Sequence, residues 1–248
     1  WLHWPETIFT YLEEDRVLFP CDFFGSHLAL GEFFADEYGN EKSLDMAKLY
    51  FAEIMMPFRK PGQNAVEKVK KLGPKMIAPS HGVIWRDPKV ILDAYSGWTG
   101  ERFEKKVLIV YVSMWGSSEK MALAMREALV KKGVTVNVFD LPNTDIGHVA
   151  KELVDSPVIV IGAPTVLGGV HPVAAYAALL LKTLRAPTKY GVVLTSYGWS
   201  GGAVKHLQEL LAGTKLEILG VVDAKGPPKE AEFGRILELA DKIAEKLG

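Results

Sequence analysis

The chain has 248 residues, of which 48% are hydrophobic, with a formal net charge of −1 and one cysteine. This apolar fraction excludes a disordered chain, and the balance of 29 basic and 30 acidic residues gives no support for a nucleic-acid-binding surface. Because Cys21 has no partner for an intramolecular disulfide, we expect a packed core and a reducing, cytoplasmic location, and no secretory leader is recognisable.

The first part of the chain, residues 1–102, contains the patterns of several short elements. Ile8–Leu12 and Arg16–Phe19 are typical of an antiparallel strand pair joined by an acidic turn. Further elements are expected as helices near Ser43–Phe58 and Gln63–Leu72, a strand at Lys75–Ala78 and a linker helix at Pro88–Trp98. These elements do not make an obvious closed core, so we expect residues 1–102 to be part of a larger domain.

From residue 103 to residue 248, short apolar runs alternate with helical stretches. The runs are Val107–Val112, Val134–Phe139, Val158–Ile161, Val192–Thr195 and Leu216–Val222. Strands that alternate with helices form right-handed crossovers, and therefore a parallel sheet covered on both faces. The second run alternates apolar with polar residues, as an edge strand does, while the other four are almost continuously apolar, as strands buried on both faces are. We expect a complete α/β domain with a doubly wound, five-stranded parallel sheet.

Two of the helical stretches have a clear apolar face. Apolar residues follow helical spacing at Met121, Ala124, Met125, Ala128 and Leu129, and again at Phe233, Ile236, Leu237, Ala240 and Leu247. One uncharged run, residues 156–181, is long enough to span a bilayer, but prolines and glycines divide it into a strand, a loop and a helix. We therefore expect no membrane segment.

Three loops follow strands at the edge where open parallel sheets bind ligands. They are Ser113–Ser118, Pro164–Pro172 and Ser196–Gly202. In the first loop, hydroxyls and backbone amides meet at a helix N-terminus, which is typical of a phosphate site. An interpretation that explains the pattern about as well is that Ser117 or Ser118 only caps the helix. The P-loop lysine and the G-x-G-x-x-G fingerprint are both absent, so nucleoside triphosphates and dinucleotides are not expected.

The loops also carry aromatic side chains and glycines. Trp115, Tyr197 and Trp199 offer ring faces for stacking, and glycines allow a flat ligand to approach the backbone. The candidate ligand-binding residues are Ser113, Met114, Trp115, Gly116, Ser117, Ser118, Pro164, Thr165, Val166, Leu167, Gly168, Gly169, Ser196, Tyr197, Gly198, Trp199, Gly201 and Gly202. The stretch Gly198–Gly202 also fits the nucleophile elbow of α/β-hydrolases, but no acid followed by a histidine comes after it, so no catalytic triad can be assembled.

Residues 105–248 resemble the flavodoxin-like FMN-binding domain. The first loop matches the hydroxyl-x-x-Gly-x-hydroxyl pattern of that domain at Ser113, Gly116 and Ser118, with serine where threonine is usual. The resemblance implies that FMN is the cofactor.

Three polar residues in the first part of the chain lie in loops beside proline or glycine. They are His3, Asp22 and His81. Two imidazoles and a carboxylate suit zinc or iron. From their spacing alone, three unrelated loop residues are the simpler interpretation.

The two parts of the chain together resemble the flavodiiron proteins, or A-type flavoproteins, over essentially the whole length. The resemblance rests on the HWP motif with its His–x18–Asp spacing, the PSHG loop and the flavodoxin-like part. It implies a metallo-β-lactamase-like αββα sandwich that holds two iron ions. His3 and His81 would each ligate one iron and Asp22 would bridge the pair, while His27 matches no ligand position.

The family also uses an H-x-E-x-D motif, and these 248 residues contain none. Two imidazoles and one carboxylate alone would leave a metal pair underligated. We therefore expect residues 1–102 to be the C-terminal part of the sandwich, with the chain either belonging to a longer polypeptide or pairing with a separate N-terminal part.

The resemblance implies an oxidoreductase that passes electrons from FMN to the diiron site and reduces O₂ to water, NO to N₂O, or both, with His3, Asp22 and His81 as catalytic residues. It also implies a small electron carrier such as a rubredoxin or a reduced deazaflavin, and a head-to-tail homodimer or tetramer. One alternative is an FMN-binding electron-transfer module whose metal domain is incomplete and inactive. A zinc hydrolase on the same sandwich would leave the flavin without a role.

Overall fold

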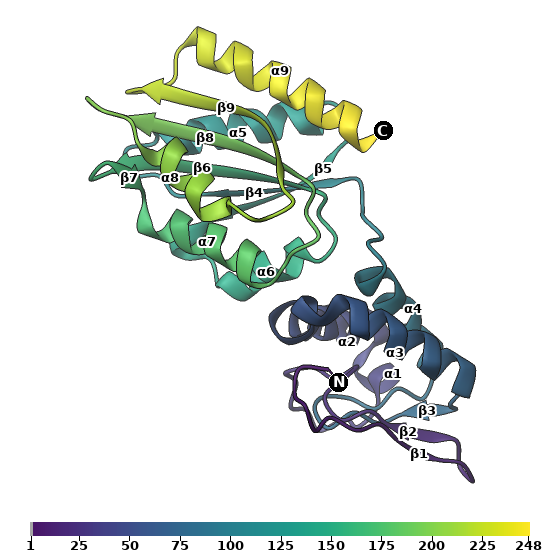
Figure 1. Ribbon diagram of the computed structural model, residues 1–248. Coiled ribbons are helices and arrows are strands. Elements are labelled where there is room, and N and C mark those ends of the chain that lie inside the picture. Colours follow the sequence, from purple (N-terminus) through teal and green to yellow (C-terminus); the bar gives the residue numbers. More distant parts are fainter. Residues whose placement is uncertain (1) are drawn as a thin grey trace. The chain divides into compact units, whose positions relative to one another are not determined.

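The computed structural model describes residues 2–248, and the chain divides into two compact units, Trp1–Arg102 and Phe103–Gly248 (Figure 1). Among the described residues, none of the helices has the length and apolarity needed to cross a membrane. The uncharged run at 156–181 folds as a strand and a helix, as its prolines and glycines predicted, but the segment between them is a hairpin and not a plain loop.

The first unit contains a small mixed sheet and several helices. Its strands are β1 (Thr10–Leu12), β2 (Val17–Phe19) and β3 (Met76–Ile77), with β1 antiparallel and β3 parallel to the central β2. Its α-helices are α1 (Ala35–Tyr38), α2 (Asn40–Tyr50), α3 (Arg59–Leu72) and α4 (Pro88–Thr99). The predicted strand pair, third strand and linker helix are all confirmed, with shorter strands.

The single helix predicted near Ser43–Phe58 is interrupted. After α2 the chain widens into a π-helical turn at Phe51–Met55 and tightens into a 3₁₀ turn at Met56–Phe58 before α3 begins. Pro57 explains the change, because proline has no amide hydrogen for the helical ladder and its ring crowds the preceding turn.

The first unit has an aromatic core of its own, which the sequence did not predict. The ring of Tyr95 lies 4.9 Å from that of Phe23, 4.7 Å from that of Phe24 and 5.2 Å from that of Phe51. All four side chains are buried. Edge-to-face rings at these distances add to the free energy gained by their burial. This core holds the segment after β2, which carries Asp22, against the helices.

The second unit is the predicted doubly wound sheet. Its parallel strands are β4 (Lys106–Tyr111), β5 (Thr135–Asp140), β6 (Val158–Val166), β8 (Tyr190–Tyr197) and β9 (Glu217–Lys225), in the order β5-β4-β6-β8-β9. Its helices are α5 (Ser117–Val130), α6 (Ile146–Leu153), α7 (Pro172–Thr183), α8 (Ala203–Leu211) and α9 (Glu230–Leu247), with a 3₁₀ turn at Leu141–Asn143. Helices α5 and α9 pack together on one face, and α6, α7 and α8 cover the other (Figure 1).

The sheet corrects three details of the sequence interpretation. β5 is an edge strand as predicted, but β9 is the opposite edge and is only partly covered, so it is not buried on both faces. β6 runs on to Val166 and turns back into a short strand, β7 (Gly169–Val170), where a plain loop was expected. Leu237 is exposed, because the buried face of α9 contains Leu239 and Ile243 instead.

Candidate functional site

The three predicted ligand loops lie side by side at the carboxyl edge of the second unit's sheet. They follow β4, β6 and β8, which are adjacent in the sheet order. Parallel strands end at the same edge, so the topology brings together residues that are far apart in the sequence. All the candidate ligand-binding residues belong to these three segments.

The first of these loops presents unpaired hydroxyls to a helix N-terminus. The Oγ atoms of Ser113 and Ser118 are buried and have no hydrogen-bond partner in the described part of the chain. Gly116 is the N-cap of α5, and no side chain of the described residues caps this helix. Ser118 is therefore not a capping residue. Buried hydroxyls beside free helix amides fit a phosphate group, whose oxygens accept hydrogen bonds from both.

The loops after β6 and β8 are fastened to each other. Leu167 and Gly168 form the two-residue turn of the β6–β7 hairpin, with φ of 49° and 78°. The amide of Ala203, at the start of α8, donates to Thr165 Oγ1 across 3.3 Å. A Cβ atom on Gly202 would overlap the carbonyl oxygen of Gly168. The two loops therefore touch through their backbones, an approach that only glycine permits.

Large apolar side chains of these loops face solvent. Trp115 is 90% exposed, Trp199 94% and Leu167 103%. Exposed side chains of this size, gathered at one edge of a sheet, are typical of a surface that a flat apolar ligand covers. Together with the phosphate-binding loop they fit a phosphorylated ring system such as FMN.

Sequence reasoning missed Asp223, which lies near the end of β9. Its Oδ1 accepts a hydrogen bond from Thr195 Oγ1 at 2.7 Å, and its Oδ2 lies 3.2 Å from the position of a Cβ on Gly201. Asp223 therefore contacts both strand β8 and the loop that follows it. Its one sequence signal is a carboxylate close to the carboxyl end of the last strand.

In the first unit, His3, Asp22 and His81 come together. Asp22 follows β2 and His81 follows β3, and the carboxyl ends of these two parallel strands are neighbours. The amide of Ser80 donates to the carbonyl of Cys21 at 2.8 Å, and that of Ser26 donates to the carbonyl of His81 at 3.2 Å. These bonds tie the loops that carry Asp22 and His81 to each other.

Asp22 lies between the two imidazoles, and each of its oxygens faces a different one. His3 Nε2 is 2.7 Å from Asp22 Oδ2, and His81 Nε2 is 3.3 Å from Asp22 Oδ1. Two donor atoms that each lie about 2.1 Å from one metal at near-right angles are about 3 Å apart. The separations therefore fit a carboxylate that bridges two metal ions, with one histidine on each.

This set is incomplete for two irons. His3 and His81 each offer one nitrogen beside one oxygen of Asp22, and within residues 2–248 no group of three or more His, Cys, Asp or Glu side chains is arranged to hold a metal ion. Non-haem iron sites need further ligands. A cavity of about 290 Å³ opens beside the cluster, lined by His3, Trp4, Glu6, Thr7, Cys21 and Asp22.

The backbone around this cluster is strained. His3, Cys21 and Phe24 have φ values of 44°, 54° and 71°, in the left-handed region that side chains other than glycine rarely adopt. Such residues persist only where the surrounding fold enforces them, and they gather at functional sites.

Tyr50 is a second residue that sequence reasoning missed. Burial raises the pKa of its phenol, and the negative charge of Asp22 raises this pKa further. Its ring lies 4.6 Å from that of His27 and 6.5 Å from that of His81. The phenol therefore remains a neutral donor beside the Asp22 carboxylate. Nothing in the sequence around α2 marks Tyr50 as a site residue.

His27 lies outside the cluster, as expected from its lack of a ligand motif. Its Nε2 is 3.8 Å from Glu53 Oε2, and the side chain is half exposed.

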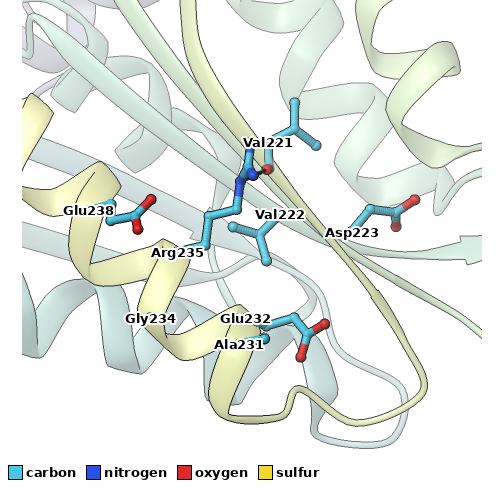
Figure 2. A pocket seen from close by; sticks show the side chains of 8 residues that line it. All are labelled: Val221, Val222, Asp223, Ala231, Glu232, Gly234, Arg235 and Glu238. Atoms are coloured by element: carbon cyan, nitrogen blue, oxygen red, sulfur yellow. Dashed lines mark hydrogen bonds between the residues drawn. The ribbon is translucent and has the colours of Figure 1, made fainter.

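A larger cavity, of about 460 Å³, lies between the edge strand β9 and helix α9 (Figure 2). Arg235 crosses it and donates from Nε to the carbonyl oxygen of Val221 at 3.1 Å. None of the predicted site residues lines this cavity, so its size does not mark the functional site. The bond to Val221 instead satisfies part of the open strand edge.

The chain matches two family models. One described as ODP family beta lactamase covers residues 1–82, and one described as flavodoxin covers residues 109–246. The second match alone spans more than half of the chain.

Similar proteins extend the likeness along the whole chain. A nitric oxide reductase of Moorella thermoacetica is 38% identical over 254 residues, which cover 99% of this chain and 63% of that protein. The solved structure of rubredoxin oxygen:oxidoreductase from Desulfovibrio gigas has a TM-score of 0.94 at 30% identity, covering 99% of this chain and 63% of the other.

The flavodiiron protein of Giardia intestinalis has a TM-score of 0.91 at 29% identity, covering 100% of this chain and 64% of that one. This chain therefore spans just under two thirds of the length of these relatives. Both family models and the full-length structural likeness agree, and the chain belongs to the flavodiiron protein family.

Proposed function

We propose that this chain is the electron-transferring and iron-bridging part of an oxidoreductase that reduces O₂, NO or both, with the remaining iron ligands supplied from outside these 248 residues. The observation that carries the proposal is the Asp22 carboxylate, which presents one oxygen to each of two imidazoles. A bridging carboxylate of this kind serves a two-metal site, and the second unit carries loops that suit a flavin.

Residues 103–248 are proposed as the FMN-binding domain. Ser113 and Ser118 bind the phosphate together with the first amides of α5, and Trp115 and Trp199 cover the ring and exclude water from it. FMN, when bound, supplies electron uptake in pairs and release one at a time.

Residues 1–102 are proposed as part of the diiron domain. His3 and His81 each hold one iron, Asp22 bridges the two, and Tyr50 keeps the bridging carboxylate oriented. Iron, when bound, supplies open coordination positions for a diatomic substrate. The cavity beside His3 and Asp22 gives such a small molecule room.

The electron donor is proposed to be a small carrier, either a rubredoxin or a reduced deazaflavin. Support for the first comes from the similar protein named rubredoxin oxygen:oxidoreductase. We also propose that a head-to-tail homodimer or tetramer brings the flavin of one subunit beside the iron of another.

A second candidate function is FMN-based electron transfer without metal chemistry. The incomplete ligand set within residues 2–248 favours it. It predicts flavin absorbance, no bound iron, and reoxidation that does not depend on Asp22.

The decisive experiment measures iron and flavin in the native protein, reduces it anaerobically, and follows flavin reoxidation after separate additions of O₂ and NO. The proposal predicts fast reoxidation with N₂O or water as product, and loss of that reaction in Asp22→Ala. Free flavins react with O₂ to give peroxide, so peroxide production at equal rates in both proteins, with no NO consumption, would leave only the electron-transfer module.

A further inference from the structure

His206 lies on α8 and faces the β6–β7 hairpin. The backbone amide of Val170 donates to its Nδ1 at 3.2 Å, and a Cβ on Gly169 would lie 2.7 Å from the same nitrogen. The imidazole is therefore pressed against the backbone of the hairpin. The roles described so far for the three ligand loops and for the His3–Asp22–His81 cluster do not involve His206.

The direction of this hydrogen bond is fixed by its donor. A backbone amide has only a proton to offer, so Nδ1 of His206 must be the acceptor and the ring proton lies on Nε2. Val170 is 4% exposed, so water does not readily replace the imidazole as the acceptor. Loss of the acceptor would leave a buried amide unsatisfied at the base of the hairpin.

The same hairpin is held at a second point. Thr165 Oγ1 accepts from the amide of Ala203, and the backbones of Gly168 and Gly202 are in contact. Thr165 and Val170 are directly opposite each other in the hairpin, and Ala203 and His206 lie on the first turn of α8. The two bonds therefore clamp both strands of the hairpin to one helix.

We propose that His206 is a positioning residue for FMN: it holds the loop after β6 in register with the loop after β8, so that the two form one preformed wall of the flavin site. The proposal rests on the proposed FMN-binding function. A preformed wall removes the cost of ordering the strained Leu167–Gly168 turn when the ligand binds, and this lowers the dissociation constant.

Three substitutions separate this role from simple packing. His206→Asn places an amide oxygen near the position of Nδ1 and keeps the acceptor. His206→Gln reaches toward the position of Nε2 instead, and His206→Ala has no acceptor. His148→Ala, at an exposed histidine on α6 of the same unit, is the matched control.

The experiment titrates the flavin-free chain of each variant with FMN and follows quenching of flavin fluorescence and the visible circular dichroism of the bound flavin. The free energy lost when a buried amide has no acceptor is about as large as the free energy of a tenfold change in the dissociation constant. We therefore expect roughly tenfold weaker FMN binding for His206→Ala and His206→Gln. We expect His206→Asn to remain within about twofold of the wild type with an unchanged spectrum. Exchange of the Val170 amide hydrogen with solvent should accelerate only in the Ala and Gln variants.

Wild-type affinity and spectrum in a folded His206→Ala variant would overturn the positioning role while leaving FMN binding intact. Binding as weak in His206→Asn as in His206→Ala would also overturn it, because the acceptor would then be irrelevant. If the wild-type chain itself does not bind FMN, the proposed function fails first, and the positioning role fails with it.

Discussion

Ser118 is expected to lower the stability of the FMN-free protein and to strengthen the binding of FMN. Its buried hydroxyl has no hydrogen-bond partner among residues 2–248, and a buried polar group without a hydrogen bond costs free energy. Ser118→Ala should therefore leave the flavin-free protein as stable as before, or stabilise it by up to about 1 kcal/mol. In the complex, a phosphate oxygen would accept a hydrogen bond from this hydroxyl. The variant lacks that bond, so it should bind FMN roughly 10-fold more weakly.

Riboflavin, which lacks the phosphate, is the matched control for Ser118→Ala. Its affinity, measured by fluorescence quenching, should be the same for wild type and variant. An equal loss of affinity for both flavins would show that Ser118 acts on the ring site and not on the phosphate.

Asp22 is the residue on which the metal proposal depends. Asp22→Asn keeps the shape of the side chain but removes the negative charge that two cations would share. Substitution of groups that merely orient a metal ligand costs about 10- to 100-fold in affinity, so losing the bridge itself should cost at least about 10-fold. Iron content per chain, measured by elemental analysis after purification, should fall accordingly.

Asp15→Asn, in the exposed turn between β1 and β2, is the control for Asp22→Asn and should keep its iron. Flavin content should be unchanged in both variants. Equal iron in the wild type and Asp22→Asn would assign the bridging role to some other carboxylate.

At the scale of elements, Gly202→Ala tests the contact between the two flavin loops. The added Cβ would overlap the carbonyl of Gly168, so one loop must move. Overpacking of this kind costs about 1–3 kcal/mol. We expect a matching loss in the free energy of unfolding, measured with urea, together with weaker FMN binding.

Gly198→Ala is the control on the same loop, because a Cβ at Gly198 would have no atom of the described residues within 4 Å. It should be tolerated, with a free energy of unfolding close to that of the wild type. If both substitutions have the same effect, flexibility of the loop matters and the contact with Gly168 does not.

Most elements could be predicted from the sequence, because hydrophobic periodicity reports burial. The alternation at Val134–Phe139 correctly marked an edge strand, and the same rule failed at Leu216–Val222. There the apolar residues of β9 pack under α9 on one face while the strand edge stays open, a distinction that depends on strand order. The π-helical turn before Pro57 also had no signal beyond the proline itself.

The site was only partly predictable, for a related reason. The three flavin loops could be found because parallel strands end at one edge. The proximity of His3, Asp22 and His81 followed from a family resemblance and not from their spacing. Tyr50, Asp223 and His206 were missed, because each acts through a contact with a segment distant in sequence that no local pattern encodes.

At the scale of the whole second unit, a buried ionic network joins the start of the sheet to helix α6. The ammonium of Lys106 on β4 is 2.9 Å from Glu152 and also pairs with Asp155, and Asn137 on β5 donates to Glu152 at 2.6 Å. Burial alone would lower the pKa of Lys106, but the charges of Asp155 and Glu152 outweigh it and raise this pKa above its usual value.

Lys106→Met should leave the two carboxylates buried without their cation and destabilise the unit by about 3–5 kcal/mol, measured by urea unfolding at neutral pH. The control is Lys205→Met, because Lys205 and Glu209 form an exposed pair. Such pairs contribute about 0.5 kcal/mol or less. Equal stabilities for the two variants would mean that the network does not hold the unit together.

The raised pKa of Lys106 also predicts how stability depends on pH. The folded chain binds the proton of the Lys106 ammonium more tightly than the unfolded chain does, because lysine in an unfolded chain has a pKa of about 10.4. The network's contribution is therefore fully present below that pH and is lost as pH rises through the folded-state pKa. The free energy of unfolding of the wild type should fall above about pH 10 more steeply than that of Lys106→Met, in which the titrating group is absent. Parallel curves for the two proteins would place the alkaline sensitivity elsewhere in the unit.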